Sequence, residues 1–259
     1  MNEETPSPHE QKMIDHLHHI ERRLASLQTT MSYIALGPER VLNFVHQDKP
    51  IAMYLPDAMT DNIQKFIMEK RHFWEERLLS KALPALTGCR SALDIGANVG
   101  NHTLFFACVA GIEKVTAFEP QRHVFGILEK NIELNGLPGV TAINSAVGEK
   151  TGSADIAIHR NTSFHGTAYR EADDGSVPVI SVDEFATDPV DFIKIDVEGM
   201  QMSVLRGAEQ VLRRDRPKLW IELRRNHNEF GPANEFLESL GVGYRASPLS
   251  GDDMLFVAR

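Results

Sequence analysis

Cysteine is scarce in this sequence. Its 259 residues contain only Cys89 and Cys108, which is too few for the multi-bridge framework of a small secreted domain. The two cysteines also lack the paired spacing of a zinc site. We therefore predict two reduced thiols that pack as small buried side chains.

Long apolar runs and an export signal are missing as well. No segment reaches the roughly 18 apolar residues that a membrane span requires. The first residues, MNEETPSPHE, are acidic and polar, whereas a signal peptide begins with basic and then apolar residues. These absences predict a cytoplasmic protein without a membrane span.

The sequence has fewer basic than acidic residues. The chain has 27 basic and 36 acidic residues, for a formal net charge of −9. Proteins that bind nucleic acids neutralise phosphates with clustered Lys and Arg, and the basic cluster 213-RRDR-216 is short enough to be the exposed end of a helix. We therefore expect no nucleic-acid partner.

Residues 1–40 carry a heptad pattern. Apolar residues follow one another in alternating steps of four and three, which is the a/d seam of a coiled coil: Met13, Leu17, Ile20, Leu24, Leu27, Met31 and Ile34. The pattern predicts an N-terminal helix that stops at Gly37 and Pro38. We expect a homo-oligomer formed through this helix, and the alternative is a helix laid on the chain's own domain.

The next two segments have different patterns. In residues 41–85, a strand-like run (51–56) leads into helical spacing (57–83), which we interpret as a lid or pre-core segment. From residue 86 to 259, short apolar runs alternate with amphipathic helices, which predicts a parallel sheet with crossovers. The expected strands are 91–96, 114–120, 140–148, 191–196, 218–223, 242–246 and 254–258, and the expected helices are 101–110, one that runs from 121 to the Asn-Gly at 135–136, and 200–215.

Because the last two strands flank the turn-rich segment 247–253, they read as an antiparallel hairpin. The fold class is therefore α/β: a Rossmann-like, seven-stranded, mostly parallel sheet with an antiparallel C-terminal hairpin, preceded by the N-terminal helix. The longest irregular stretch runs from about 150 to 177 and contains His159 and His165, two candidate substrate contacts.

The loop 93-LDIGANVGNHT-103 lies where open parallel sheets bind ligands. A dinucleotide fingerprint would need a glycine at Asn98, and the carboxylate of Asp94 would repel a pyrophosphate. S-adenosylmethionine is cationic and has no phosphate, and we expect Gly96 and Gly100 to leave room for it. Glu119 ends the second strand, where a carboxylate can accept the ribose hydroxyls. The pattern favours S-adenosylmethionine, and a nicotinamide oxidoreductase is the alternative.

The sequence resembles the FkbM family of class I methyltransferases. The resemblance rests on 93-LDIGANVGNHTLFFA-107, 117-AFEPQ-121, 144-NSAVG-148, 182-VDEF-185 and above all 191-DFIKIDVEGMQMSVLRGAE-209. It implies S-adenosylmethionine as the donor and a hydroxyl of a sugar, glycan or natural product as the small-molecule acceptor. The further cofactor contacts that it implies are Glu75 (after Phe73 and Trp74), Ala97, Asn98, His102, Thr103, Pro120, Ser145 and Ala146.

Three carboxylates are candidate catalytic residues. Asp196 and Glu198 follow the fourth parallel strand and Glu222 ends the fifth, so all three should meet at one rim of the sheet. Asp196 is the first choice for a base or an orienter of the acceptor, and it also counts as a cofactor contact. Glu198 could instead be a helix N-terminal charge, and Glu222 could pair with Arg224 or Arg225.

Two further possibilities remain open at this rim. Three carboxylates could hold a divalent metal, although nothing in their spacing requires one. The chain could also bind the cofactor without turnover, as an assembly partner held by its coiled coil. Lys194, in the fourth strand, is expected to make a structural pair.

Overall fold

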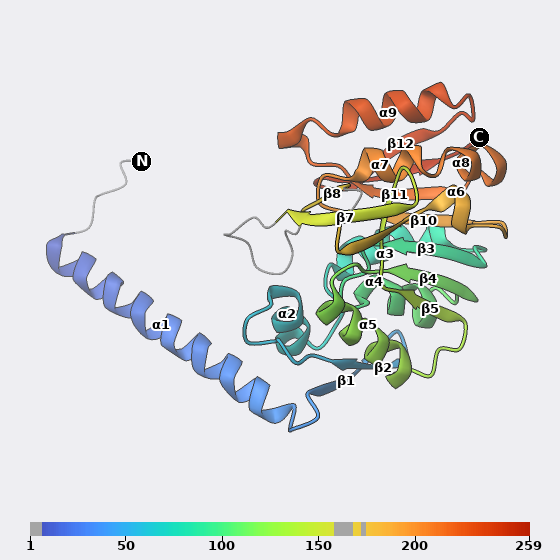
Figure 1. Ribbon diagram of the computed structural model, residues 1–259. Helices are drawn as coiled ribbons and strands as arrows, with labels where there is room; N and C mark the ends of the chain where they lie inside the picture. The colour runs from blue at the N-terminus through green and yellow to red at the C-terminus, as the bar shows by residue number, and fades with distance from the viewer. Residues whose placement is uncertain (1–6, 158–167, 172–174) are drawn as a thin grey trace.

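The computed structural model describes residues 7–157, 168–171 and 175–259. A seven-stranded sheet in the order β12-β13-β11-β10-β3-β4-β5 forms the centre (Figure 1). The strands from β11 to β5 in this order are parallel, while β13 and β12 are antiparallel to their neighbours. This order confirms the predicted fold class. The strands are β3 (Ser91–Ile95), β4 (Lys114–Phe118), β5 (Val140–Ile143), β10 (Phe192–Ile195), β11 (Lys218–Glu222), β12 (Arg245–Ser250) and β13 (Asp253–Val257).

Apolar clusters cover both faces of the sheet. On one face, Phe192 and Trp220 pack with a first set of elements, and on the other, Ile193 and Ile221 pack with a second set, because successive strand side chains point to opposite faces. The first set includes α3 (Glu76–Leu86), α4 (Asn101–Leu104), the π-helix η1 (Phe105–Val109) and α5 (Arg122–Leu134). The second set includes α6 (Val182–Phe185), α7 (Gln201–Arg206), α8 (Glu209–Asp215) and α9 (Phe230–Ser239).

The segment 41–85 is part of this core. It begins with an antiparallel hairpin of β1 (Val41–His46) and β2 (Lys49–Tyr54), of which only β2 was expected, and continues into α2 (Asn62–Lys70) and α3. Phe73 has no exposed surface and its ring contacts those of Phe44 and Phe105. The segment predicted to be a lid or a pre-core element is thus packed into the core of the domain.

Two predicted elements are interrupted in the structure. The stretch 140–148 divides into β5 and β6 (Ala146–Gly148), which belongs to a second sheet of order β6-β9-β7-β8. The helix 200–215 divides into α7 and α8 at Gly207, where a Cβ would lie 2.0 Å from the carbonyl oxygen of Gly148. That close approach of β6 requires a glycine at this position.

The second sheet replaces much of the expected irregular stretch. Its other strands are β7 (Gly152–Ala157), β8 (Ala168–Glu171) and β9 (Val177–Ser181), so the prediction of a loop over 150–177 was wrong for these residues. His159 and His165 lie outside the described residues. A short 3-10 helix, η2 (Arg225–His227), follows β11.

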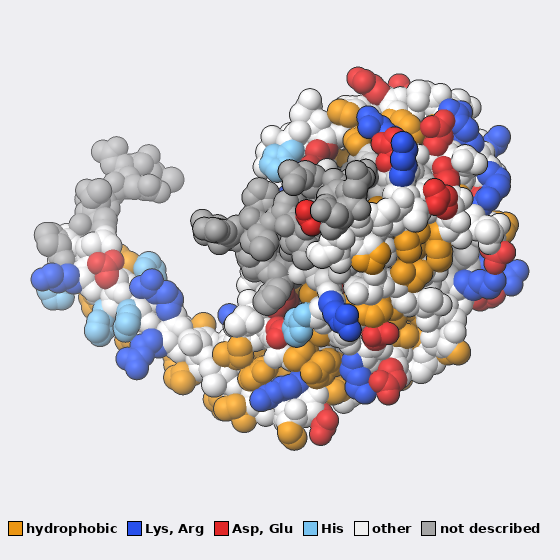
Figure 2. Space-filling model, viewed as in Figure 1, with side chains coloured by type: hydrophobic (Ala, Val, Ile, Leu, Met, Phe, Trp, Pro, Cys, Tyr) orange, Lys and Arg blue, Asp and Glu red, His pale blue; other side chains and the backbone are white. Residues whose placement is uncertain are grey.

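Helix α1 (Pro8–Ala35) confirms the predicted N-terminal helix and stands away from the body (Figures 1 and 2). A capping box between Ser7 and Glu10 begins it. Its heptad seam is exposed, so the structure does not adopt the alternative in which the seam lies on the chain's own domain. Within the part of the chain that the structure describes, no helix is long and apolar enough to cross a membrane.

Gly96 makes the tightest backbone approach beside the pocket. Its φ is +82° and a Cβ there would lie 1.9 Å from the carbonyl oxygen of Asp196. The bare Cα expected to face a ligand therefore accommodates the neighbouring strand's backbone. We expect Gly96→Ala to lower the free energy of unfolding by about 3 kcal/mol or more, as measured by urea denaturation.

Gly126→Ala is the matched control for that substitution. Gly126 is exposed within α5, and no described atom lies within 4 Å of the Cβ it would gain. The control should raise stability by about 0.5 to 1 kcal/mol because alanine favours a helix. Equal stabilities for the two variants would contradict the close approach at Gly96.

Candidate functional site

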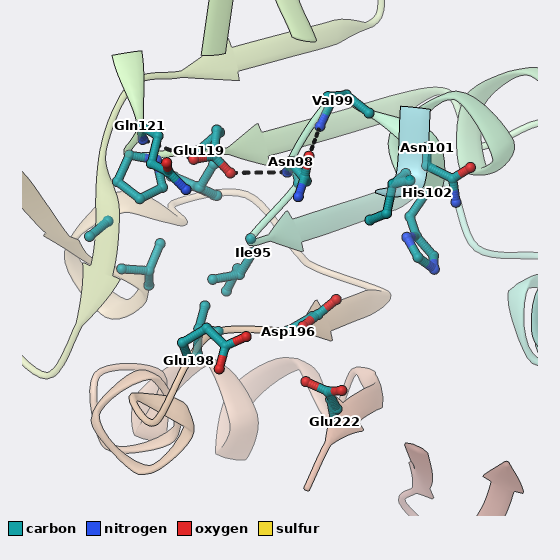
Figure 3. Close-up of a pocket in the computed structure, with 18 of the residues that line it drawn as sticks. Ile95, Asn98, Val99, Asn101, His102, Glu119, Gln121, Asp196, Glu198 and Glu222 are labelled. Carbon is teal, nitrogen blue, oxygen red and sulfur yellow. Dashed lines mark hydrogen bonds between the residues drawn. The ribbon is translucent and has the colours of Figure 1, made fainter. Parts of the chain in front are cut away.

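A pocket of about 470 Å³ opens at the carboxyl ends of the parallel strands. It lies where the chain order reverses, between β3 and β10, the usual ligand site of an open α/β sheet. Figure 3 shows Glu119 and Gln121 toward one end and Asp196, Glu198 and Glu222 toward the other. Twelve of the predicted site residues line it: Glu75, Gly96, Ala97, Asn98, His102, Glu119, Pro120, Ser145, Ala146, Asp196, Glu198 and Glu222.

The carboxylate of Glu119 is fixed by main-chain donors. The backbone N–H of Asn98 donates to one oxygen (3.0 Å) and that of Gln121 to the other (2.8 Å), as the dashed lines in Figure 3 show. Burial raises the pKa of Glu119 to about 7, against the opposing effect of these two donors. Each oxygen has a second lone pair for a ligand hydroxyl.

Asn98 adopts the conformation that its position demands. Its φ is +51°, which glycine favours and asparagine tolerates. Its Oδ1 accepts a hydrogen bond from the N–H of Val99 (2.7 Å), and its own N–H is directed at Glu119. The position where a dinucleotide fingerprint has glycine thus keeps a left-handed backbone, with the side chain serving the turn.

Three predicted cofactor contacts lie behind the pocket wall. Asp94 and Thr103 have no exposed surface, and the Thr103 hydroxyl donates to Asp94 Oδ2 (2.6 Å). A Cβ at Gly100 would lie 2.8 Å from Cδ1 of Leu128, so its bare Cα accommodates α5. None of the three is among the residues that line the pocket, so their contact with the ligand stays a prediction. They support the loop from behind.

Lys194 joins Asp94 to the pocket. Its Nζ lies 3.1 Å from Asp196 Oδ2 and 3.6 Å from Asp94 Oδ1, and 2% of the side chain is exposed. Burial acts to lower the pKa of Lys194, but Asp196 and Asp94 raise it above its usual value. The ammonium therefore stays charged between two carboxylates, which confirms the expected structural pairing.

Asp196 and Glu222 act on each other electrostatically. Asp196 lines the pocket, with 42% of its side-chain surface exposed, and Glu222 lines the same pocket. Burial and the nearby charge of Asp196 raise the pKa of Glu222 to about 8. Burial also acts to raise the pKa of Asp196, but Lys194 lowers it overall. Glu222 is therefore the more readily protonated of the two.

Glu198 is engaged by Arg224, a pocket residue that sequence reasoning offered only as a partner for Glu222. The guanidinium forms an ion pair with Glu198, while its Nη2 is 3.9 Å from Glu222 Oε2. Glu198 is thus held in an ion pair, and its catalytic role stays a prediction. Within the described ranges, no three His, Cys, Asp or Glu side chains converge to hold a metal ion, so the metal hypothesis finds no donor set there.

The wall opposite is built by Asn101. Its side chain accepts from the N–H of Trp74 (2.9 Å) and donates to the carbonyl of the same residue (3.1 Å). This clamp precedes Glu75, whose φ is +58°. Burial, with smaller contributions from Asp253 and Asp196, raises the pKa of Glu75 to about 7. Sequence reasoning did not single out Asn101, although its place at the start of the helix after the glycine loop was visible.

His102 has an unused ring nitrogen. Its Nε2 lies 3.7 Å from Glu75 Oε2 and has no hydrogen-bond partner among the described residues. Burial, and then the charge of Lys194, lower the pKa of His102 well below its usual value, so the ring is neutral. A neutral imidazole and a half-buried carboxyl group thus face the pocket together.

Asn144 holds the end of the pocket beyond Glu119. Its side-chain amide donates to the carbonyls of Glu119 (2.9 Å) and Pro120 (3.1 Å). Ser145 and Ala146 follow at the start of β6 and line the same end. The division between β5 and β6 therefore places these two residues at the pocket.

Strand order, an acid fixed after the second parallel strand and a pocket at the switch point define a Rossmann-like domain with its ligand site in the usual place. Residues 94–245, more than half of the chain, match the methyltransferase FkbM domain, and the chain belongs to this family. In the solved methyltransferase FkbM from Methylobacillus flagellatus, the similar region has a TM-score of 0.55 at 19% identity and covers 75% of this chain and 52% of that one.

Two curated relatives match part of the chain. Methyltransferase 1 of Beauveria bassiana is 25% identical over 58% of this chain and 70% of its own length. The hexuronic acid methyltransferase AglP of Haloferax volcanii is 30% identical over 46% of this chain and 50% of its own length. The match thus spans half of AglP.

The raised pKa of Glu222 predicts how stability depends on pH. Glu222 has an ordinary pKa of 4.5 and a folded pKa of about 8, so its contribution to stability is complete below pH 4.5 and is lost as pH rises through 8. In Glu222→Gln the side chain is uncharged at every pH. We expect the unfolding free energy of the wild type to fall relative to this variant by roughly 1 to 2 kcal/mol over that range.

Thermal unfolding at a series of pH values measures this difference. Glu238→Gln, on the exposed side of α9, is the control for a carboxylate-to-amide change, and its curve should run parallel to that of the wild type. A difference between Glu222→Gln and the wild type that grew toward acid pH would contradict the raised pKa.

Proposed function

We propose that this chain is an S-adenosylmethionine-dependent O-methyltransferase that acts on a hydroxyl of a sugar, glycan or natural product. The observation that carries the proposal is Glu119, whose two oxygens are fixed by the N–H groups of Asn98 and Gln121 beside the pocket. A fixed pair of acceptors suits the two ribose hydroxyls of the donor. Membership of a methyltransferase family supports the same reaction.

The residues at the pocket fit the rest of the donor. In the Nε2–H tautomer, the unpartnered Nε2 of His102 can donate a hydrogen bond to the carboxylate of S-adenosylmethionine. Glu75 can accept a hydrogen bond from the amino group of the same molecule. Ser145 and Ala146 would face the adenine. The donor would supply an electrophilic methyl group on a sulfonium, so most of the catalytic effect rests on how the protein orients the acceptor oxygen.

Asp196 and Glu222 are the groups that would take up the proton of the acceptor hydroxyl. Asp196 is open to the pocket and can accept a hydrogen bond from an acceptor hydroxyl, which makes it the orienting group. Proton uptake is favoured when the pair is fully ionised, because the pair then regains the proton held with a pKa of about 8. Lys194 holds Asp196 in position during this exchange.

The charge of the pocket indicates which class of acceptor it favours. Among the described lining residues Arg224 is the single permanent cation, and it is already paired with Glu198. Five carboxyl side chains line the same pocket: Glu75, Glu119, Asp196, Glu198 and Glu222. This balance favours an uncharged hydroxyl acceptor over one that carries a carboxylate near the reacting oxygen, as a hexuronic acid does.

Donor binding tests the role of Glu119. The wild type should bind S-adenosylmethionine and its demethylated product in isothermal titration, and Glu119→Ala should lose at least about tenfold in affinity, since it removes both acceptors. Glu129→Ala, on the exposed face of the helix that follows Glu119, should bind like the wild type. Binding of NAD in place of S-adenosylmethionine, or an unchanged affinity in Glu119→Ala, would refute the proposal.

Methyl transfer tests the role of the carboxylate pair. With labelled donor and matched panels of alkyl glucosides and glucuronides, we expect turnover on the uncharged panel, with a rate that rises with pH to a plateau above about 8. Asp196→Asn should lower that rate by about 10² to 10⁴ and leave donor affinity within a few fold. Donor binding without turnover on any hydroxylated acceptor would instead support the non-catalytic assembly partner.

A further inference from the structure

The heptad seam of α1 is a continuous apolar surface exposed in the single chain. Its side chains are between 43% and 69% exposed, although all are large and apolar. Monomeric proteins rarely leave so long an apolar strip uncovered. The seam consists of Met13, Leu17, Ile20, Leu24, Leu27, Met31 and Ile34.

Helix α1 contacts its own body through the opposite face. The Thr29 hydroxyl bonds to Glu69 of α2, and the Tyr33 hydroxyl donates to the carbonyl of Pro56 (2.9 Å). With Leu17, Leu24 and Met31 at position a of the heptad, Thr29 falls at f and Tyr33 at c, on the side away from a and d. The body thus holds the helix with its seam turned outward, so none of the described residues of the chain covers the seam.

The charges of α1 indicate a helical partner. The helix carries three acidic residues (Glu10, Asp15 and Glu21) and three basic residues (Lys12, Arg22 and Arg23). Helices that lie on membranes have a polar face rich in Lys and Arg, which this balance does not provide. A narrow seam with strict steps of four and three is the geometry of knobs-into-holes packing.

We propose that α1 pairs with α1 of a second copy of this chain as a parallel, in-register, two-stranded coiled coil. In this arrangement all seven seam residues of each helix meet their counterparts. An antiparallel pairing that matches a with d leaves one seam residue of each helix, Met13 or Ile34, without a layer partner. Parallel pairing therefore buries the whole exposed strip.

The flanking residues are compatible with that pairing. In a parallel pair, position g of one helix lies beside position e of the other, five residues farther on. His16 then lies beside Glu21 of the second copy, and Arg23 beside Gln28, so no like charges oppose each other. Because each body is attached at the outer face, the two bodies lie on opposite sides of the coiled coil and do not compete for space.

Sedimentation of the full chain tests the proposal. The wild type should sediment as a dimer that dissociates on dilution, because about three heptads are close to the shortest stable length. Leu17→Lys with Leu24→Lys keeps helix propensity but charges the seam, and should weaken the dimer by about a hundredfold or more. His18→Lys with Ala25→Lys makes the same change at exposed b positions and should leave the dimer unchanged.

Each result of the sedimentation experiment either supports or overturns the coiled-coil proposal. A wild type that stays monomeric at the highest concentration overturns the proposal, and so does a dimer that the two pairs of substitutions affect equally. Circular dichroism and the thermal midpoint of the body show whether the seam variant is folded. Binding of the wild type to lipid vesicles, lost in the seam variant while both stay monomeric, would assign the seam to a membrane surface.

Cross-linking tests the orientation. In a parallel pair, Leu24 faces Leu24 of the second copy, so Leu24→Cys should form an intersubunit disulfide with oxidised glutathione. In an antiparallel pair, Leu24 would face Ile20 or Leu27, and Leu24→Cys should remain uncross-linked in an intact dimer. The wild type, whose Cys89 is buried and Cys108 half-buried, gives the background.

Discussion

The buried ammonium of Lys194 is the constraint on which the rest of the site depends. An uncompensated charge in a protein interior is strongly unfavourable, so Lys194 must stay between Asp94 of β3 and Asp196 of β10. Lys194 and Asp94 are register partners in the parallel pair of strands, which means that the ion pair and the strand register require each other. Through the Thr103 hydroxyl, Asp94 also secures the helix that follows the loop. One cation thus joins two strands, a helix and the pocket-facing carboxylate.

The pocket is lined by carboxyl groups, but several of them can carry a proton near neutral pH. Burial raises the pKa of Glu75, Glu119 and Glu222 to neutrality or above, so these groups can be protonated where Asp196 is ionised. A cationic ligand that enters would favour their charged forms, because an opposite charge stabilises a carboxylate. Ligand binding and proton release are therefore linked at this site. The ring of His102 is neutral, so it adds a polar group to the same wall without changing the net charge of the pocket.

The sequence predicts the sheet, its hairpin and the position of Glu119, because strand periodicity and the acid after the second strand are local signals. It does not predict which neighbours occupy the space at Asp94 and Gly100, since a pattern shows only that a loop must bend, and these neighbours are Lys194 and Leu128. The division of 140–148 into two strands depends on pairing with β9, which is a tertiary contact. The pairing of Glu198 with Arg224 is invisible for the same reason, as the two residues lie on different loops.

The donors that hold Glu119 are main-chain groups, and this has an evolutionary consequence. A backbone N–H is present whatever side chain its residue carries. Gln121 can therefore be substituted without loss of its hydrogen bond to Glu119, and Asn98 can be replaced by another residue that accepts a left-handed backbone. The opposite end of the pocket is held by the side chains of Arg224 and Glu198, where a single substitution alters charge and shape. Divergence within a lineage should therefore gather at that end of the pocket, while the end that holds Glu119 is inherited with little change.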